Sequence, residues 1–239
     1  LLVTSRARFT LPGMVAHDLE ALPEAEAMEL LLEICPRISE SAGRLAELCG
    51  CLPLALRISA SVLASDDTFS VGRYLERLDR ERLAALRDPD EPEADVEASL
   101  RLSFDALDPP AREVLCQIGV FAASFDLVAA EAVVQVPDVK DVADTLGLLR
   151  RRSLLEWDAA KERYRLHELV RAFASGRLVG AEVIWLRYAQ YYEQIALQAD
   201  NLCLQGSESL LAGLALFGAE RVHIDAGWGW ARQHAGETL

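Results

Sequence analysis

Residues 163–174 place one histidine, His167, where a short alternating strand passes into an amphipathic helix. The first turn of a helix has unpaired backbone N–H groups and a partial positive charge, so it favours an anion. An imidazole at that point adds a directed hydrogen-bond donor. The junction is therefore a candidate phosphate site, although a histidine there also serves as an ordinary helix cap or core residue.

A second group of residues that could bind a ligand is the run of Arg150, Arg151 and Arg152 at the end of a predicted helix. It is the main basic concentration in a chain whose net charge is −14. Arginines at a helix end complement the dipole of that helix, and they also suit DNA phosphates. The net charge repels a polyanion and disfavours DNA as a partner of this segment.

The composition indicates a globular chain of two or three units, with 239 residues and 51% hydrophobic content. No apolar run approaches the ~20 residues that span a bilayer, and the start does not resemble a signal peptide. We therefore expect a cytoplasmic protein with no membrane partner. The five cysteines lack the paired spacing of a metal site, so we expect reduced thiols and no metal. A preference for arginine over lysine favours a bacterial source.

The hydrophobic pattern predicts a mainly α-helical fold. A small helical bundle comes first, with a third helix that begins near Pro53, and an acidic, proline-containing linker follows. Next come three helices, two of them capped by Asp108 and Asp126, and a β-hairpin, which is the pattern of a winged helix. The expected units are a terminal strand at 1–12, a helical domain at 13–86, the linker at 87–97, a winged-helix domain at 98–180 and C-terminal helices at 181–239. In the last unit the pattern predicts one helix from Ala181 and separate helices over 210–217 and 220–230.

The first residues, Leu1 to Val3, have the pattern of a buried strand that ends in Thr4, Ser5 and Arg6. A buried strand needs neighbours to satisfy its backbone hydrogen bonds, and no further parallel strand pattern follows. The strand is therefore expected to belong to an α/β domain upstream of this segment. Polar residues at the carboxyl end of a parallel strand face the ligand crevice of such a sheet.

Three separated segments then carry a family resemblance. Leu-Leu-Val-Thr-Ser-Arg at 1–6, Cys-Gly-Cys-Leu-Pro-Leu-Ala-Leu at 49–56 and Leu-His-Glu-Leu-Val at 166–170 occur in that order. Together with the winged-helix pattern, they resemble the second half of the NB-ARC class of signal-transduction ATPases, also called STAND ATPases. The resemblance covers roughly residues 1–178 and includes bacterial regulators.

The resemblance implies three nucleotide-binding residues. Arg6 matches the sensor arginine that reaches the γ-phosphate end of the nucleotide, and Pro53 matches the proline that packs on its base and ribose. His167 matches the histidine that holds the β-phosphate of ADP. Cys51 stands where the family's Gly-Leu-Pro-Leu motif has glycine, so it is strained if that position needs a positive φ.

The residues that flank His167 also depart from the family motif Met-His-Asp, because Leu166 replaces the methionine and Glu168 the aspartate. Leucine keeps an apolar anchor. Glutamate keeps the charge and reaches one methylene farther.

The implied function is a switch that binds ADP at rest, is held autoinhibited by it, and exchanges it for ATP on activation. Its expected partners are adenine nucleotide, the upstream NTPase core and, on activation, further copies of itself. The sequence contains no Gly-x-x-x-x-Gly-Lys-Ser/Thr cradle (Walker A) and no acidic magnesium strand (Walker B), so this segment alone should not hydrolyse ATP. Mg²⁺ would be held by the upstream domain, and no catalytic set can be assembled from the histidines.

Two other functions stay open from the sequence. The first is a DNA-binding winged-helix transcriptional regulator that uses Arg150 to Arg152. The second is a pure scaffold whose helices only pack together and which binds no small molecule.

Overall fold

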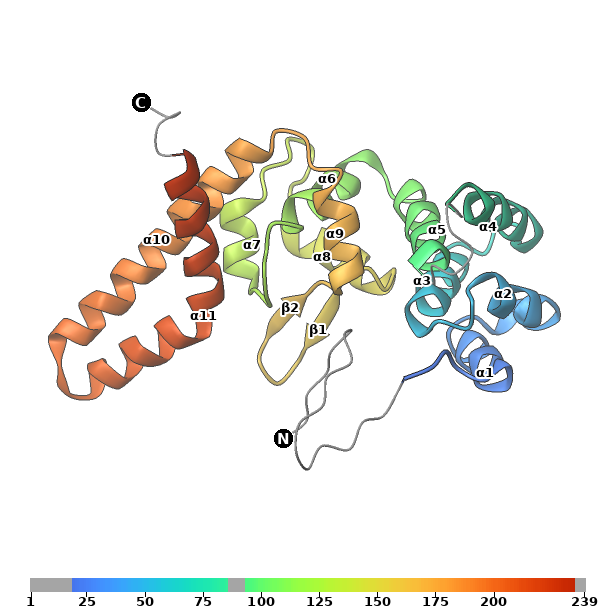
Figure 1. Cartoon of the computed structure of the whole chain (residues 1–239), viewed down its shortest axis with the longest axis horizontal. Helices are drawn as coiled ribbons and strands as arrows, with labels where there is room; N and C mark the ends of the chain where they lie inside the picture. The colour runs from blue at the N-terminus through green and yellow to red at the C-terminus, as the bar shows by residue number, and fades with distance from the viewer. Residues whose placement is uncertain (1–18, 86–92, 235–239) are drawn as a thin grey trace.

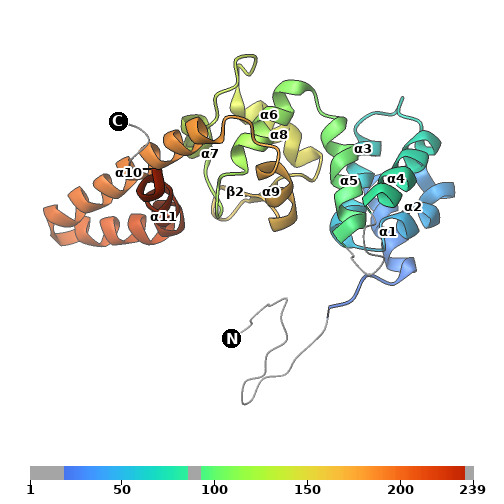
Figure 2. The ribbon, with the colours of Figure 1, turned by 45° about the horizontal axis from the view of Figure 1, so that its top comes forward.

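The structure is a computed structural model that describes residues 19–85 and 93–234 (Figure 1). A helical bundle at one end, residues 24–85 and 93–105, is followed by a winged-helix unit at 109–175 and a pair of long helices at 181–234 (Figure 2). The fold is mainly α-helical with one small β-hairpin, as the sequence predicts. The predicted strand at 1–12, with Arg6, lies outside the described residues.

The bundle contains the helices that the spacing of apolar residues predicts. Its core includes Leu31, Leu45 and Leu56, which are fully buried, and burial of such side chains is the main favourable contribution to folding. Its first elements are α1 (Glu24–Ile34), the 3-10 helix η1 (Pro36–Ser41), α2 (Ala42–Leu48), α3 (Pro53–Ala64) and α4 (Val71–Ala85).

The predicted linker at 87–97 is partly wrong, because helix α5 (Glu93–Asp105) begins inside it. This helix packs against α3 and α4, so its residues from 98 onward join the bundle rather than the winged helix where the sequence placed them. The acidic composition favoured a linker, but the segment begins a helix whose apolar side chains, Val96 and Leu100 among them, are buried. Asp95 is also buried there, with its Oδ1 2.6 Å from Nε of Arg82.

The winged-helix unit follows with its helices, a short hairpin and a last helix. Both predicted caps are confirmed, since Asp108 accepts a hydrogen bond from the N–H of Ala111 and Asp126 from that of Ala129. In the hairpin, Trp157 pairs with Tyr164. The elements are α6 (Pro109–Ile118), α7 (Leu127–Val133), α8 (Val142–Arg151), β1 (Glu156–Asp158), β2 (Arg163–Arg165) and α9 (Glu168–Ser175).

Two long helices, α10 (Ala181–Gln205) and α11 (Ser207–His234), complete the described chain as an antiparallel pair (Figure 1). The sequence predicted separate helices at 210–217 and 220–230, but α11 is continuous through this region. Packing along α10 offsets the cost of the glycines in α11. Gly213 and Gly227 allow this packing, because a Cβ atom at either position would meet the backbone of α10 within 3.2 Å.

Candidate functional site

His167 is the N-cap residue of α9, where the sequence placed it. Its Nδ1 accepts a hydrogen bond from the backbone N–H of Leu169 at 3.2 Å. Because Nδ1 acts as the acceptor, the neutral ring carries its proton on Nε2, which is then a donor directed away from the helix. The side chain is half-buried.

The start of α9 faces α5 of the bundle, and a small cavity of about 160 Å³ lies between them. Leu169, the residue that donates to His167, lines this cavity, and Arg177 covers the ring of Phe173 at 3.5 Å. Nucleotide-sized sites usually occupy at least ~300 Å³. This cavity therefore does not enclose a nucleotide by itself, although it lies next to the candidate donor.

Pro53 begins α3 at a tight corner whose backbone has an unusual conformation. Gly50 and Cys51 both have positive φ, of 57° and 52°. The N–H groups of these two residues bond to the carbonyls of Glu47 and Ala46, which caps α2 in a Schellman arrangement. The position held by Cys51 therefore does need a positive φ, and the cysteine is strained there.

Of the three residues assigned to a nucleotide, the structure describes Pro53 and His167. Pro53 is exposed at the start of α3, and His167 lies at the start of α9 in the next unit. Among the described residues, no hydrogen bond or ion pair joins them, and Arg6 lies outside the described range. Their common use in one site stays a prediction.

The bundle and the winged-helix unit meet at the ends of α3 and α8. Ser61 Oγ lies 2.7 Å from Ser153 Oγ, which joins the two units directly. Arg152 is half-buried beside this contact, and its Nε is buried without a hydrogen-bond partner. Burial lowers the pKa of Arg152, while the carboxylate of Asp66 in the bundle acts in the opposite direction. Arg152 is therefore turned toward the bundle.

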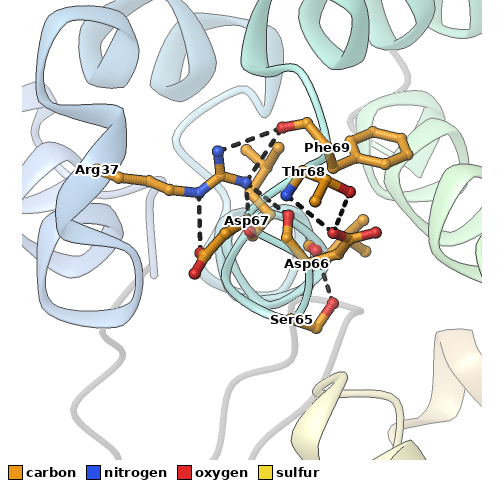
Figure 3. A network of polar contacts seen from close by, with 8 residues as sticks. Arg37, Ser65, Asp66, Asp67, Thr68 and Phe69 are labelled. Atoms are coloured by element: carbon orange, nitrogen blue, oxygen red, sulfur yellow. Dashed lines mark hydrogen bonds and ion pairs between the residues drawn. The ribbon is translucent and has the colours of Figure 1, made fainter.

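The loop that carries Asp66 is held rigidly by Arg37 of η1 (Figure 3). The guanidinium of Arg37 donates to the carbonyl of Leu63 at 2.6 Å and to that of Phe69 at 3.2 Å. Asp66 accepts hydrogen bonds from the hydroxyl and the N–H of Thr68, which lower its pKa. The carboxylate that faces Arg152 thus has a defined position.

The arginine run does not act as one patch, since Arg150 and Arg151 are exposed at the end of α8 while Arg152 is directed inward. The opposite end of α8 is acidic, because Asp141 caps the helix and Asp144 lies in its first turn. In helix-turn-helix proteins the first residues of the third helix read the bases. Positive charge on α8 is therefore concentrated where phosphates, rather than bases, would be contacted.

Three further observations on the described residues concern membrane spans, metal sites and a buried thiol. No described helix is long and apolar enough to cross a membrane. Within the same ranges, no group of three His, Cys, Asp or Glu side chains is placed to hold a metal ion. Cys49 is buried, and burial raises the pKa of its thiol to about 12. A thiol with that pKa is a poor nucleophile at neutral pH.

Residues 107–179, which include α6 to α9, match the winged helix-turn-helix domain family. The chain contains a winged helix-turn-helix domain. It is also 37% identical over 182 residues to the Regulatory protein AfsR of Streptomyces coelicolor, and 35% identical over 181 residues to the Regulatory protein AfsR of Streptomyces griseus. Each match covers 72% of this chain and 18% of the relative, so the chain spans about a fifth of their length.

These matches show that the chain is homologous to bacterial regulatory proteins. The winged helix-turn-helix domain makes duplex DNA a candidate partner, which the net charge alone had disfavoured. The caps, the helix spacing and the hairpin pattern predicted this domain from the sequence.

Proposed function

We propose that this chain is part of a bacterial transcriptional regulator whose winged helix-turn-helix domain carries the regulatory function. The observation that supports this most directly is the family match of residues 107–179, with three helices and a wing in the expected order. The relatives in two Streptomyces species are named as regulatory proteins. Two mechanisms are compatible with this role, and each has its own test.

In the first mechanism the domain contacts duplex DNA. Helix α8 would approach the major groove, and Arg150 and Arg151 would contact phosphates, since both side chains are exposed. Arg152 would not take part because it faces the bundle. A contact with two phosphates implies a modest affinity with a shallow salt dependence, since each phosphate contributes ~0.9 to the slope of log affinity against log salt.

The test measures binding of the complete regulator to duplex DNA at several salt concentrations. Replacing Arg150 and Arg151 together by alanine should lower the slope of log affinity against log salt by about 2, because each phosphate contact contributes ~0.9. The matched control removes two exposed arginines of the bundle, Arg57 and Arg73, and should leave the slope unchanged. Equal effects of the two double variants, or no binding at ~50 mM salt, would reject this mechanism.

In the second mechanism the regulator is a nucleotide-dependent switch of the NB-ARC type, resting with ADP and activated by exchange for ATP. The specific support is His167, whose Nε2–H donor points outward from the first turn of α9. The N–H groups of that turn and the imidazole suit a phosphate. The exposed ring of Pro53 is available to pack on a base.

The same mechanism also assigns roles to Arg6 and to an upstream NTPase core. Arg6 would contact the γ-phosphate end of ATP, and an upstream NTPase core would hold Mg²⁺ and supply any hydrolysis. Such a switch needs different contacts with its two nucleotides, and it is expected to assemble with further copies when activated.

The nucleotide mechanism is tested by ADP affinity of the complete regulator with two substitutions of His167. Serine keeps an oxygen that caps α9 but cannot reach a phosphate, whereas alanine removes both roles. Both variants should bind ADP about tenfold more weakly, because a hydrogen bond to a charged group is lost. Only the alanine variant should also lose stability, by about 1 kcal/mol. If the serine variant kept full ADP affinity, His167 would act only as a helix cap and the proposed phosphate contact would be rejected.

A further inference from the structure

Helix α11 contributes a glutamate and a histidine to a buried polar cluster at the wing. Arg163 of β2 forms an ion pair with Glu220, using both carboxylate oxygens, and it also donates to the backbone carbonyl of Ser124. The side chains of Arg163 and Glu220 are only 16% and 10% exposed. A buried pair of this kind is costly to break, because either partner alone leaves an uncompensated charge.

His223 is one turn farther along α11 and is fully buried. Its Nε2 lies 2.9 Å from the carbonyl oxygen of Ser124, and its Nδ1 lies 2.7 Å from the hydroxyl of Tyr188 in α10. The carbonyl can only accept, so Nε2 carries the proton and Nδ1 accepts from Tyr188. Tyr192 stacks on the imidazole, with ring centres 4.7 Å apart.

Both sets of contacts converge on the same short segment of the winged-helix unit. Ser124 precedes Phe125, whose N–H and carbonyl pair with the carbonyl and N–H of Tyr164 in the wing. The ion pair and the histidine therefore hold the wing and the loop before α7 against two helices that lie far away in the sequence. Buried hydrogen-bonded networks of this kind favour one relative position over others.

We infer that Arg163, Glu220, His223 and Tyr188 form a latch that couples the position of the wing to the docking of the α10–α11 pair. The wing moves with the helix pair while the latch is closed, and it is released when the pair is displaced. This device goes beyond the proposed function and operates in the same way under either mechanism. It also keeps Arg163 away from other anions.

The test is hydrogen exchange of the 239-residue chain, followed at the amides of Phe125 and Tyr164. Glu220→Gln retains the size of the side chain but removes the charge, and it should accelerate exchange at both amides by about tenfold. The amides of α6 serve as an internal reference and should change little. The control is Asp225→Asn, which breaks an exposed ion pair with Arg221 on the same helix. It should leave both reporters unchanged.

A second, milder variant keeps the test decisive if Glu220→Gln prevents folding. Tyr188→Phe removes only the hydroxyl that donates to His223 and should accelerate the same two amides by about threefold. Faster exchange in α11 without any change at Phe125 and Tyr164 would overturn the coupling. The same conclusion would follow if Asp225→Asn affected the reporters as much as Glu220→Gln.

Discussion

Substitutions of Cys51 test whether the backbone is strained at the corner before α3. Its φ of 52° lies in the left-handed region that L-residues other than glycine seldom adopt. The corner is held by hydrogen bonds from the N–H of Cys51 to the carbonyl of Ala46 and from the N–H of Leu22 to the carbonyl of Cys51. The strain therefore cannot relax without breaking these bonds. Cys51→Gly should stabilise the bundle relative to Cys51→Ala.

The size of the effect follows from two opposing contributions. Left-handed backbone costs a residue with a Cβ atom about 1–2 kcal/mol, and glycine avoids this cost. Glycine also has more freedom in the unfolded chain, which costs about 0.4–1 kcal/mol relative to alanine. Both variants lack the thiol, so its lost contacts cancel in the comparison. The glycine variant should be more stable than the alanine variant by about 1 kcal/mol.

The assay must report on the bundle itself. All four tryptophans, at positions 157, 185, 228 and 230, lie outside it, so their fluorescence does not follow its unfolding. Native-state hydrogen exchange of amides in α2 and α3 is suitable, since these helices flank the corner. If the alanine variant equals or exceeds the glycine variant in protection, the argument from backbone strain is refuted.

Two further predictions concern other parts of the fold. Gly50→Ala should destabilise the bundle by about 2 kcal/mol or more, because its φ is positive and the new Cβ would lie 2.4 Å from Oδ2 of Asp95. Gly72→Ala on α4, where a Cβ would meet only Oγ of Ser70 at an ordinary contact distance of 4.0 Å, should instead stabilise it by about 0.5–1 kcal/mol in the same exchange assay. Burial lowers the pKa of His223, so the unfolded chain takes up its proton first as the pH falls. Stability at α10–α11 should therefore decline below about pH 6.5, and His223→Gln should flatten that decline in urea titrations followed by tryptophan fluorescence. If stability of His223→Gln declined with falling pH as it does in the unsubstituted chain, His223 would not be the group responsible for the decline.

The sequence predicted most of the helices and their ends, because these depend on short-range interactions. Asp108, Asp126 and Pro53 lie at helix starts, and Gly50 follows the end of α2, as their residue types indicate. The wing was also predicted in nearly the right place. The position of His167 as the first residue before α9 follows from the same local rules.

The predictions that were wrong concern α5 and α11, and both of these helices depend on contacts between segments far apart in the sequence. The first residues of α5, 93–97, were predicted as linker because of their acidic composition and nearby prolines, and the rest of the helix was assigned to the winged-helix domain. Only packing on α3 and α4 makes α5 a helix of the bundle. The continuity of α11 likewise depends on its contacts with α10. In both cases tertiary contacts override the local preference.

The roles of the charged side chains were decided only by the tertiary structure. The sequence shows three adjacent arginines, yet Arg152 faces Asp66 of the bundle while its two neighbours are exposed. It gives no sign that Arg163 pairs with Glu220, 57 positions away. Helix periodicity and capping arise from neighbours along the chain, so the sequence alone determined them. The partner of a buried charge depends on which surfaces meet after folding, and only the assembled structure determines that.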